Sequence, residues 1–217
     1  MYVEAEWDPR DPTGEMDFVQ QQREKYGFPT VAIAQAWLDR DDCVALLESH
    51  AARGFVRGVR HKPRAGMMDE RRWRAGYARL APLGLHFELQ CPWRQLDEAA
   101  RLARDFPDTT LVVNHTGMPD GNQGWFAEMR KLAGCENVMV KISGMGVPRP
   151  EAVLGAIELF GARRAMFASN FPVDSLRASF ERIYADFAFL TKDMSATERR
   201  ALFHDNAVRI YRMEPFA

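Results

Sequence analysis

Polar residues with catalytic potential stand where apolar stretches of this chain end. His115 lies in the segment Val113–Pro119, where a buried run gives way to a sharp turn. Asn170 closes another apolar run, and Asp174 follows it four residues later. A histidine can polarise a carbonyl group or exchange a proton near neutral pH. We therefore take His115, Asn170 and Asp174 as the candidate catalytic residues.

Four further polar residues lie in or just after apolar stretches. They are Glu6, Arg60, His61 and Gln90. Strands covered on both faces are normally apolar, so polar side chains in them are informative. We predict that these four residues bind the substrate. Arg60 would hold a substrate carboxylate through charge-assisted hydrogen bonds.

For other polar residues, a role in stabilising the fold is an alternative to a role in the site. Glu4 and Lys141 could form a buried ion pair that fixes strand register, or they could line the site. Cys91 ends an apolar stretch and is either a reactive thiol or an inert buried one. Three histidines are predicted to be structural: His86, because it begins its strand, and His50 and His204, because they fall in helices.

The elements that would position these residues repeat along the chain. Apolar stretches alternate with helical patterns at a spacing of roughly 27 residues, the rhythm of a (β/α) barrel. We predict strands over Tyr2–Trp7, Thr30–Leu38, Phe55–Lys62, Leu85–Cys91, Thr110–Gly117, Val138–Gly144 and Ala165–Pro172. The helices predicted between and after them are Glu15–Tyr26, Asp41–Arg53, Asp69–Ala81, Gln95–Phe106, Trp125–Leu132, Pro150–Phe160, Leu176–Leu190 and Ala196–Tyr211. Ser195 with Glu198 forms a capping box for the last of these.

This pattern predicts a single domain over residues 1–217, a (β/α)8 TIM-like barrel with about seven of its eight parallel strands present. A doubly wound sheet is the rival architecture. The segment Trp7–Arg10 after the first strand lacks the glycine-rich loop expected of the nucleotide-binding version of that fold. In a barrel, the catalytic groups lie at the C-terminal ends of the strands, so His115 and Asn170 should share one end.

Composition narrows the class of function. The net charge is −1, so no broad field favours nucleic acid or an anionic membrane. No apolar run reaches 18 residues, the length of a membrane span. Cys43, Cys91 and Cys135 lie far apart without metal-binding spacing, and their odd number and the absence of a leader lead us to expect a reduced cytoplasm.

Five motifs, in order and at barrel spacing, resemble those of the amidohydrolase-related hydrolases, in the branch of the sugar-acid lactonases and the pyrone-dicarboxylate lactonase. They are Val3–Pro9, Arg57–His61, Asn114–Pro119, Lys141–Gly144 and Met166–Asp174. The resemblance covers essentially the whole chain. It implies a distorted (β/α)8 barrel that hydrolyses a lactone or related acyl bond of a small molecule.

The resemblance also implies roles for individual residues. His115 matches a histidine that polarises the carbonyl or holds a divalent metal, and Asn170 matches an acid that takes a proton from water. This chain departs from the family in two ways: it has no His-x-His pair, and it carries Asn170 where the acid is expected. An amide cannot act as a general base. Asp174 either takes that role or caps a helix starting near Ser175.

Without the histidine pair, we expect the first family strand to be absent from this chain. A divalent metal, Zn or Mn, is then expected only in a longer form. Two functions follow: a lactonase-like hydrolase, or a catalytically inactive barrel that persists as a remnant or interaction partner. A phosphate-binding barrel such as an aldolase is a weaker reading. Unpaired edges on Tyr2–Trp7 and Ala165–Pro172 predict association between copies of the chain.

Overall fold

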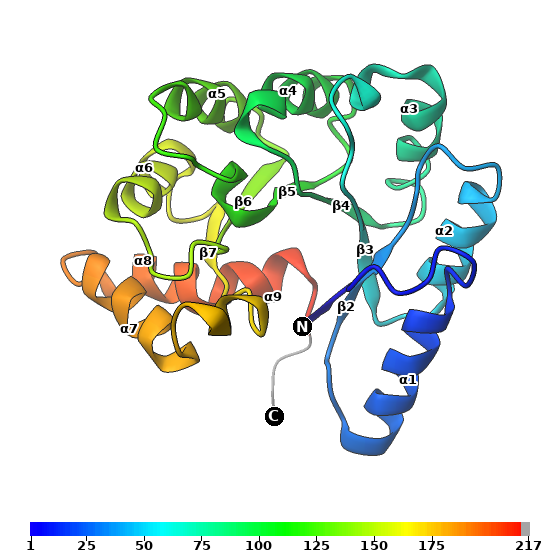
Figure 1. Cartoon of the computed structure of the whole chain (residues 1–217), viewed down its shortest axis with the longest axis horizontal. Helices are drawn as coiled ribbons and strands as arrows, with labels where there is room; N and C mark the ends of the chain where they lie inside the picture. Colours follow the sequence, from blue (N-terminus) through cyan, green and yellow to red (C-terminus); the bar gives the residue numbers. More distant parts are fainter. Residues whose placement is uncertain (214–217) are drawn as a thin grey trace.

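Seven parallel strands form a single sheet in which each strand pairs with the next one along the chain (Figure 1). The computed structural model describes residues 1–213. The strands are β1 (Tyr2–Val3), β2 (Ala32–Gln35), β3 (Val56–His61), β4 (His86–Leu89), β5 (Leu111–Val113), β6 (Val138–Ile142) and β7 (Ala165–Phe167).

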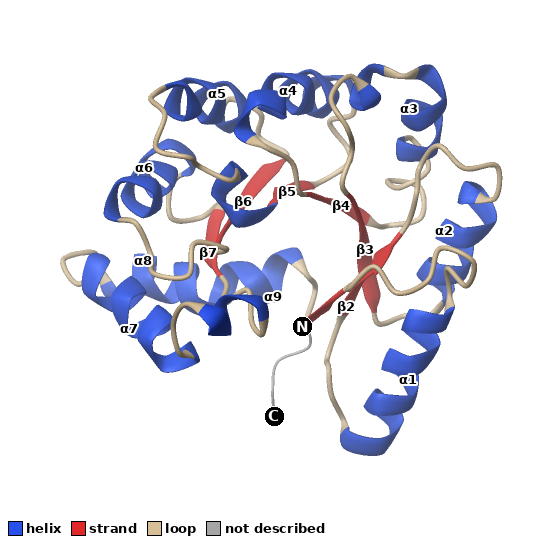
Figure 2. Ribbon diagram, viewed as in Figure 1, coloured by secondary structure: helices blue, strands red, loops and turns tan. Residues whose placement is uncertain are grey.

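Most of the helices connect successive strands and cover the convex, outer face of the sheet, whereas the last helix of the chain packs on its inner side (Figure 2). The helices are α1 (Gly14–Tyr26), α2 (Cys43–Ala52), α3 (Arg71–Tyr77), α4 (Leu96–Asp105), α5 (Gly124–Ala133), α6 (Pro150–Phe160), α7 (Phe180–Leu190), α8 (Ala196–Arg200) and α9 (Asn206–Ile210). Parallel strands joined by helices curl in this way because the right-handed crossovers keep the helices on the outside.

The sheet is curled into a half-barrel, so the predicted incomplete TIM barrel is confirmed. Within residues 1–213, β1 and β7 are the two edges of the sheet and do not pair with each other. Association between copies of the chain through these edges stays a prediction. In the described part of the chain, no helix is both long enough and apolar enough to cross a membrane.

The main core lies between the sheet and its outer helices. Trp73 and Tyr77 of α3 are fully buried and pack on Phe87 of β4, with ring centroids 5.2–5.6 Å apart. Burying each such ring stabilises the fold by roughly 1.5–3 kcal/mol. A second, smaller cluster lies inside the curve of the sheet. It contains Tyr211, which follows α9, and Ile33 of β2.

The strands are shorter than predicted, chiefly at their C-terminal ends. The segments that follow β5 and β7 leave the sheet as tight turns, because His115 and Asn170 adopt positive φ angles. The predicted last helix, Ala196–Tyr211, is also interrupted. One π-helical turn, Ala201–Asp205, separates α8 from α9. The capping box of Ser195 and Glu198 is confirmed.

Candidate functional site

A cleft of about 530 Å³, lined by both polar and apolar side chains, opens at the C-terminal ends of the strands. Its walls come from the first strand, from the end of β3, from the turns after β5 and β6, and from the loop after β7. Side chains that line it include Glu6, Arg60, Lys62, His115, Lys141, Ser143 and Asn170. His115 and Asn170 therefore share one end of the sheet, as predicted.

The turn that carries His115 has an unusual backbone. His115 and Thr116 have φ angles of 52° and 56°, the left-handed region that non-glycine residues seldom occupy. Asn114, just before them, donates from Nδ2 to the Glu88 carboxylate and, at 3.3 Å, to the Val112 carbonyl oxygen. Trp125 Nε1 donates to the Thr116 carbonyl oxygen at 2.8 Å. These bonds hold a conformation that the sequence alone disfavours.

The imidazole of His115 is neutral at neutral pH. Burial, followed by the positive charges of Lys141 and Arg60, lowers the pKa of His115 to about 4. Its Nδ1 lies 3.1 Å from the hydroxyl of Ser143. A neutral imidazole can donate a hydrogen bond to a carbonyl oxygen without carrying a charge.

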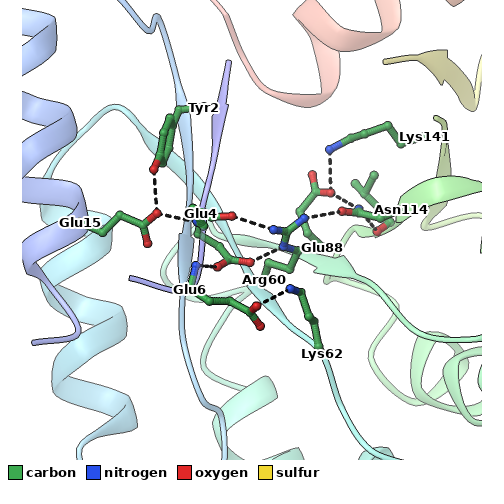
Figure 3. Close-up of polar contacts among 11 residues, drawn as sticks. Tyr2, Glu4, Glu6, Glu15, Arg60, Lys62, Glu88, Asn114 and Lys141 are labelled. Carbon is green, nitrogen blue, oxygen red and sulfur yellow. Dashed lines mark hydrogen bonds and ion pairs between the residues drawn. The ribbon is translucent and has the colours of Figure 1, made fainter. Parts of the chain in front are cut away.

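Beneath the cleft, the carboxylate of Glu88 joins several elements (Figure 3). Glu88 is fully buried, and its Oε2 lies 2.9 Å from Lys141 Nζ. Tyr211 donates to Oε1 at 2.6 Å, and Asn114 donates to Oε2. Burial opposes ionisation of Glu88, but the charge of Lys141, the neighbouring His86 ring and the hydrogen bond from Tyr211 hold its pKa well below the usual range. We call Glu88, Lys141, Asn114 and Tyr211 the interior network.

Arg60 joins the interior network to the first strand. Its Nε pairs with the Glu4 carboxylate, and its guanidinium also donates to the Glu4 carbonyl oxygen at 2.7 Å and to Asn114 Oδ1 at 3.4 Å (Figure 3). The possible pairing of Glu4 with Lys141 is therefore wrong. Arg60 lies on β3, nearer to the first strand, while Lys141 lies across the interior beside Glu88.

Glu6 lies at the rim of the cleft, where its carboxylate pairs with Lys62 at 2.8 Å (Figure 3). Both side chains keep substantial contact with solvent, with 53% of the Glu6 side chain and 34% of the Lys62 side chain exposed. Glu6 also has a positive φ angle of 55°. This pair is thus the exposed counterpart of the pair between Lys141 and Glu88.

Asn170 and Asp174 lie together after β7, but only Asn170 lines the cleft. Asn170 Nδ2 donates to Asp174 Oδ1 at 3.0 Å, and the backbone N–H of Gly146 donates to Asp174 Oδ2 at 3.0 Å. The buried Asp174 carboxylate thereby ties the loop after β7 to the loop after β6. The alternative role as a cap for the next helix is wrong, because Ser179 caps α7.

Two predicted binding residues lie outside the cleft. His61 is buried on the outer side of β3, where its Nδ1 accepts a hydrogen bond of 3.0 Å from Trp73 Nε1. Burial lowers the pKa of His61 to about 4. Gln90 follows the end of β4, is half-buried and is not among the residues that line the cleft. Cys91 is also buried, which raises the pKa of its thiol to about 12.

Two residues that contribute to the site and its interior network, Lys62 and Tyr211, were not identified from the sequence. Lys62 lies one residue beyond β3, and the alternation of side chains along the strand places it on the same side as Arg60. This alternation could have identified Lys62 from the sequence. Tyr211 gave no local signal, since it reaches Glu88 from 123 residues along the chain.

The donor set of the cleft does not fit a divalent metal. Among residues 1–213, no three histidine, cysteine, aspartate or glutamate side chains converge in a way that could hold an ion. Glu6 is paired with Lys62, and both oxygens of Asp174 accept N–H groups. The chemistry proposed below is therefore built from the side chains of the cleft.

A second hollow of about 310 Å³ lies at the opposite end of the strands, around His86, Asp108 and Arg209. Residues at that end of a (β/α) barrel usually serve stability. His86 fits this reading, because its ring packs against Tyr211 at a centroid distance of 5.1 Å. We therefore place the candidate site in the cleft that contains His115.

Comparison with known proteins identifies the family. The profile of the amidohydrolase family matches residues 5–213. The chain belongs to this family. The uncharacterized protein y4mH of Sinorhizobium fredii is 38% identical, over 98% of this chain and 80% of that protein. An L-fucono-1,5-lactonase of Burkholderia multivorans is 25% identical over a match that covers 72% of this chain and 62% of that lactonase.

Solved structures of this amidohydrolase's neighbours share its fold. An amidohydrolase from Burkholderia multivorans with bound zinc superposes with a TM-score of 0.85 at 24% identity, covering 98% of this chain and 82% of that one. A putative 2-pyrone-4,6-dicarboxylic acid hydrolase from Pseudomonas putida gives 0.67 at 23% identity, covering 93% and 88%. At these identities the likeness concerns the fold.

Proposed function

We propose that this amidohydrolase hydrolyses a lactone, the cyclic carboxylic ester of a small sugar acid or dicarboxylic acid, with water as the nucleophile. The observation that carries the proposal is a neutral histidine, His115, in a cleft at the C-terminal ends of the strands. The related L-fucono-1,5-lactonase supports the substrate class. The neighbour named as a pyrone-dicarboxylic acid hydrolase shares the fold.

In the proposed mechanism, His115 donates a hydrogen bond to the lactone carbonyl oxygen and stabilises the oxyanion that forms there. Asn170 uses its Nδ2 on Asp174, so its amide oxygen can accept a hydrogen bond from the attacking water. Glu6 is a carboxylate at the cleft that can take the proton from that water. Glu6 then returns this proton to the leaving alkoxide as the ring opens, so the carboxylate is regenerated.

Binding of a substrate carboxylate is assigned to Arg60 and Lys62. Three N–H groups of Arg60 donate to Glu4 and Asn114, and a guanidinium carries five. The remaining donors can meet an anionic substrate at the cleft. His61 is left out of this role because its ring contacts Trp73 on the other side of β3.

A divalent metal is not part of this mechanism. The Burkholderia multivorans neighbour contains zinc, but within residues 1–213 of this chain no group of three histidine, cysteine, aspartate or glutamate side chains could hold a metal ion. If turnover requires a metal, we propose that it is Zn or Mn. Comparing activity with and without chelator tests this separately.

The alternative is a barrel without catalytic activity. The observation that favours it is the amide of Asn170 in the place where the family resemblance implies an acid, with Asp174 held behind it by two N–H groups. In this case the cleft would bind a small acid without hydrolysing it. Calorimetric binding of the open acid, with no turnover of its lactone, would favour this reading.

The test is a pH-stat assay with a panel of sugar-acid 1,5-lactones and 2-pyrone-4,6-dicarboxylate, with EDTA and with added Zn or Mn. We expect turnover that His115→Ala reduces by about a hundredfold or more, the scale of losing an oxyanion donor. His204→Ala is the matched control, because His204 is exposed and pairs with Asp205 on the last helical segment. Unchanged turnover in His115→Ala, or none from the folded protein across the panel, would reject the proposal.

A further inference from the structure

Ser143 and His115 come from different elements and meet at the floor of the cleft. Ser143 follows β6 directly and is 2% exposed, while His115 lies in the turn after β5. The Ser143 hydroxyl lies 3.1 Å from His115 Nδ1. Both residues line the cleft, so this contact belongs to the candidate site.

The backbone after Ser143 fits closely around the imidazole. Gly144 has a φ angle of 72°, and a Cβ atom on it would lie 2.4 Å from His115 Nδ1 and 2.6 Å from Cγ. A side chain there would displace the ring. The Nδ1 edge of His115 is therefore held against Ser143 and Gly144, and Nε2 lies on the far edge of the ring.

The available donors and acceptors determine whether Ser143 or His115 Nδ1 donates in this hydrogen bond. A serine hydroxyl has one proton to donate, and within residues 1–213 the contact with His115 is the hydrogen bond that the Ser143 side chain makes. If Nδ1 carried a proton, it would donate to the hydroxyl oxygen, and the buried hydroxyl proton would be left without an acceptor, which costs free energy. Donation from Ser143 to Nδ1 satisfies both groups.

The surroundings also disfavour a doubly protonated ring. Burial and the positive charges of Lys141 and Arg60 disfavour protonation of His115, and they outweigh the opposite effect of the Asp174 and Glu88 carboxylates. An imidazolium would add a third positive charge there. The ring is thus neutral and carries one proton.

We propose that Ser143 is a positioning residue that fixes His115 as the tautomer with its proton on Nε2. His115 then presents an N–H donor from its far edge, and Ser143 sets that donor without contacting the substrate. The catalytic meaning of this arrangement rests on the proposed function. The tautomer itself does not, so it can be measured without any substrate.

The experiment is long-range 1H–15N correlation spectroscopy of the 15N-histidine-labelled full chain at pH 7. The His115→Gln variant assigns the signal by its loss. We expect a protonated Nε2 and an unprotonated Nδ1 in the wild type. Ser143→Ala should shift His115 toward a mixture of tautomers, and Ser143→Thr, which keeps the hydroxyl, should restore the wild-type pattern.

Ser169→Ala is the matched control, because Ser169 also lines the cleft but its hydroxyl accepts from the Phe171 backbone N–H at 3.2 Å. It should leave the His115 signals unchanged. Circular dichroism melting confirms that each variant is folded. A proton on Nδ1 in the wild type, or a folded Ser143→Ala variant with the wild-type tautomer, would overturn the proposal.

Turnover adds a second readout. If the lactonase assay succeeds, Ser143→Ala should lower kcat by about 10- to 100-fold with little change in KM, and Ser143→Thr should recover most of it. A Ser143-dependent tautomer without any lactone turnover would reject the proposed function alone. Turnover that is insensitive to Ser143→Ala would reject the positioning role alone.

Discussion

The interior network and the mouth of the cleft lie in the same barrel but are built differently. In the interior, the Glu88 carboxylate is fully buried and receives donors from β6, from the turn after β5 and from the end of α9. At the mouth, Glu6, His115 and Asn170 have positive φ angles and line an open cleft. Strained backbone of this kind persists where the surrounding structure holds it in place.

The comparison teaches that the same ion-pair chemistry serves two purposes. Lys141 and Glu88 are at most 5% exposed, so their pairing is required once both charges are buried. Glu6 and Lys62 are solvated, so their pairing contributes little and leaves both side chains available to a ligand. The interior network fixes the position of Asn114, and the turn that begins at Asn114 places His115 at the mouth of the cleft.

The sharpest way to break this comparison is to remove one partner from each pair. Lys141→Met leaves Glu88 as an unpaired buried carboxylate, and we expect a loss of about 3–5 kcal/mol in the free energy of unfolding. Lys62→Met, the matched control at the mouth, should cost less than about 1 kcal/mol. Urea unfolding at pH 7 measures both, and equal losses would contradict the distinction.

The hydroxyl of Tyr211 tests how far the interior network depends on the end of the chain. Tyr211→Phe keeps the ring against His86 but removes the 2.6 Å hydrogen bond to Glu88. We expect a loss of about 2 kcal/mol, the scale of a hydrogen bond to a charged group. Tyr2→Phe is the control, since Tyr2 donates to Glu15 at 2.8 Å in a partly buried position, and its loss should be smaller. The reverse order in urea unfolding would show that the interior network is not the more demanding site.

Acid should reveal the buried neutral histidines. The pKa values of His50, His61 and His115 are lowered to about 4, mainly by burial, from about 6.5 in the unfolded chain. Between these values the unfolded chain binds more protons, so the free energy of unfolding falls as the pH drops from 6.5 toward 4. His115→Asn should reduce this slope by about 1.4 kcal/mol per pH unit. Urea unfolding at several pH values measures it, and a slope that stays unchanged would place the His115 pKa near its ordinary value; His204→Asn is the control.

The smallest expected effect concerns backbone strain at the mouth. Glu6→Gly relieves a positive φ angle of 55° at an exposed position and should raise the free energy of unfolding by about 0.5 kcal/mol, after the loss of its pairing with Lys62. Ala5→Gly, at the neighbouring exposed residue without a positive φ, should lower it by about 0.5–1 kcal/mol. Opposite signs in thermal unfolding would sharpen the comparison, and equal signs would contradict it.

The amino-acid pattern by itself determined the order of strands and helices in the barrel and which candidate residues lie at the C-terminal ends of the strands. Apolar stretches that alternate with helical patterns allow few arrangements, because parallel strands need helical crossovers. From this, the sequence predicts that His115 and Asn170 meet at the C-terminal ends of β5 and β7. It also predicts the capping box before α8, because that motif lies within four consecutive residues.

Tertiary structure decided which polar side chains meet. Adjacent residues of a strand face opposite sides, so Arg60 points inward while His61 points toward α3. The partners of Glu4 and Lys141 depend on the curl of the sheet, which the sequence pattern leaves open. Tyr211 reaches Glu88 because the last helix packs across the half-barrel, and no local pattern records a contact over 123 residues. Hydrophobic periodicity is local, whereas the pairing of buried charges depends on distances set by the whole fold.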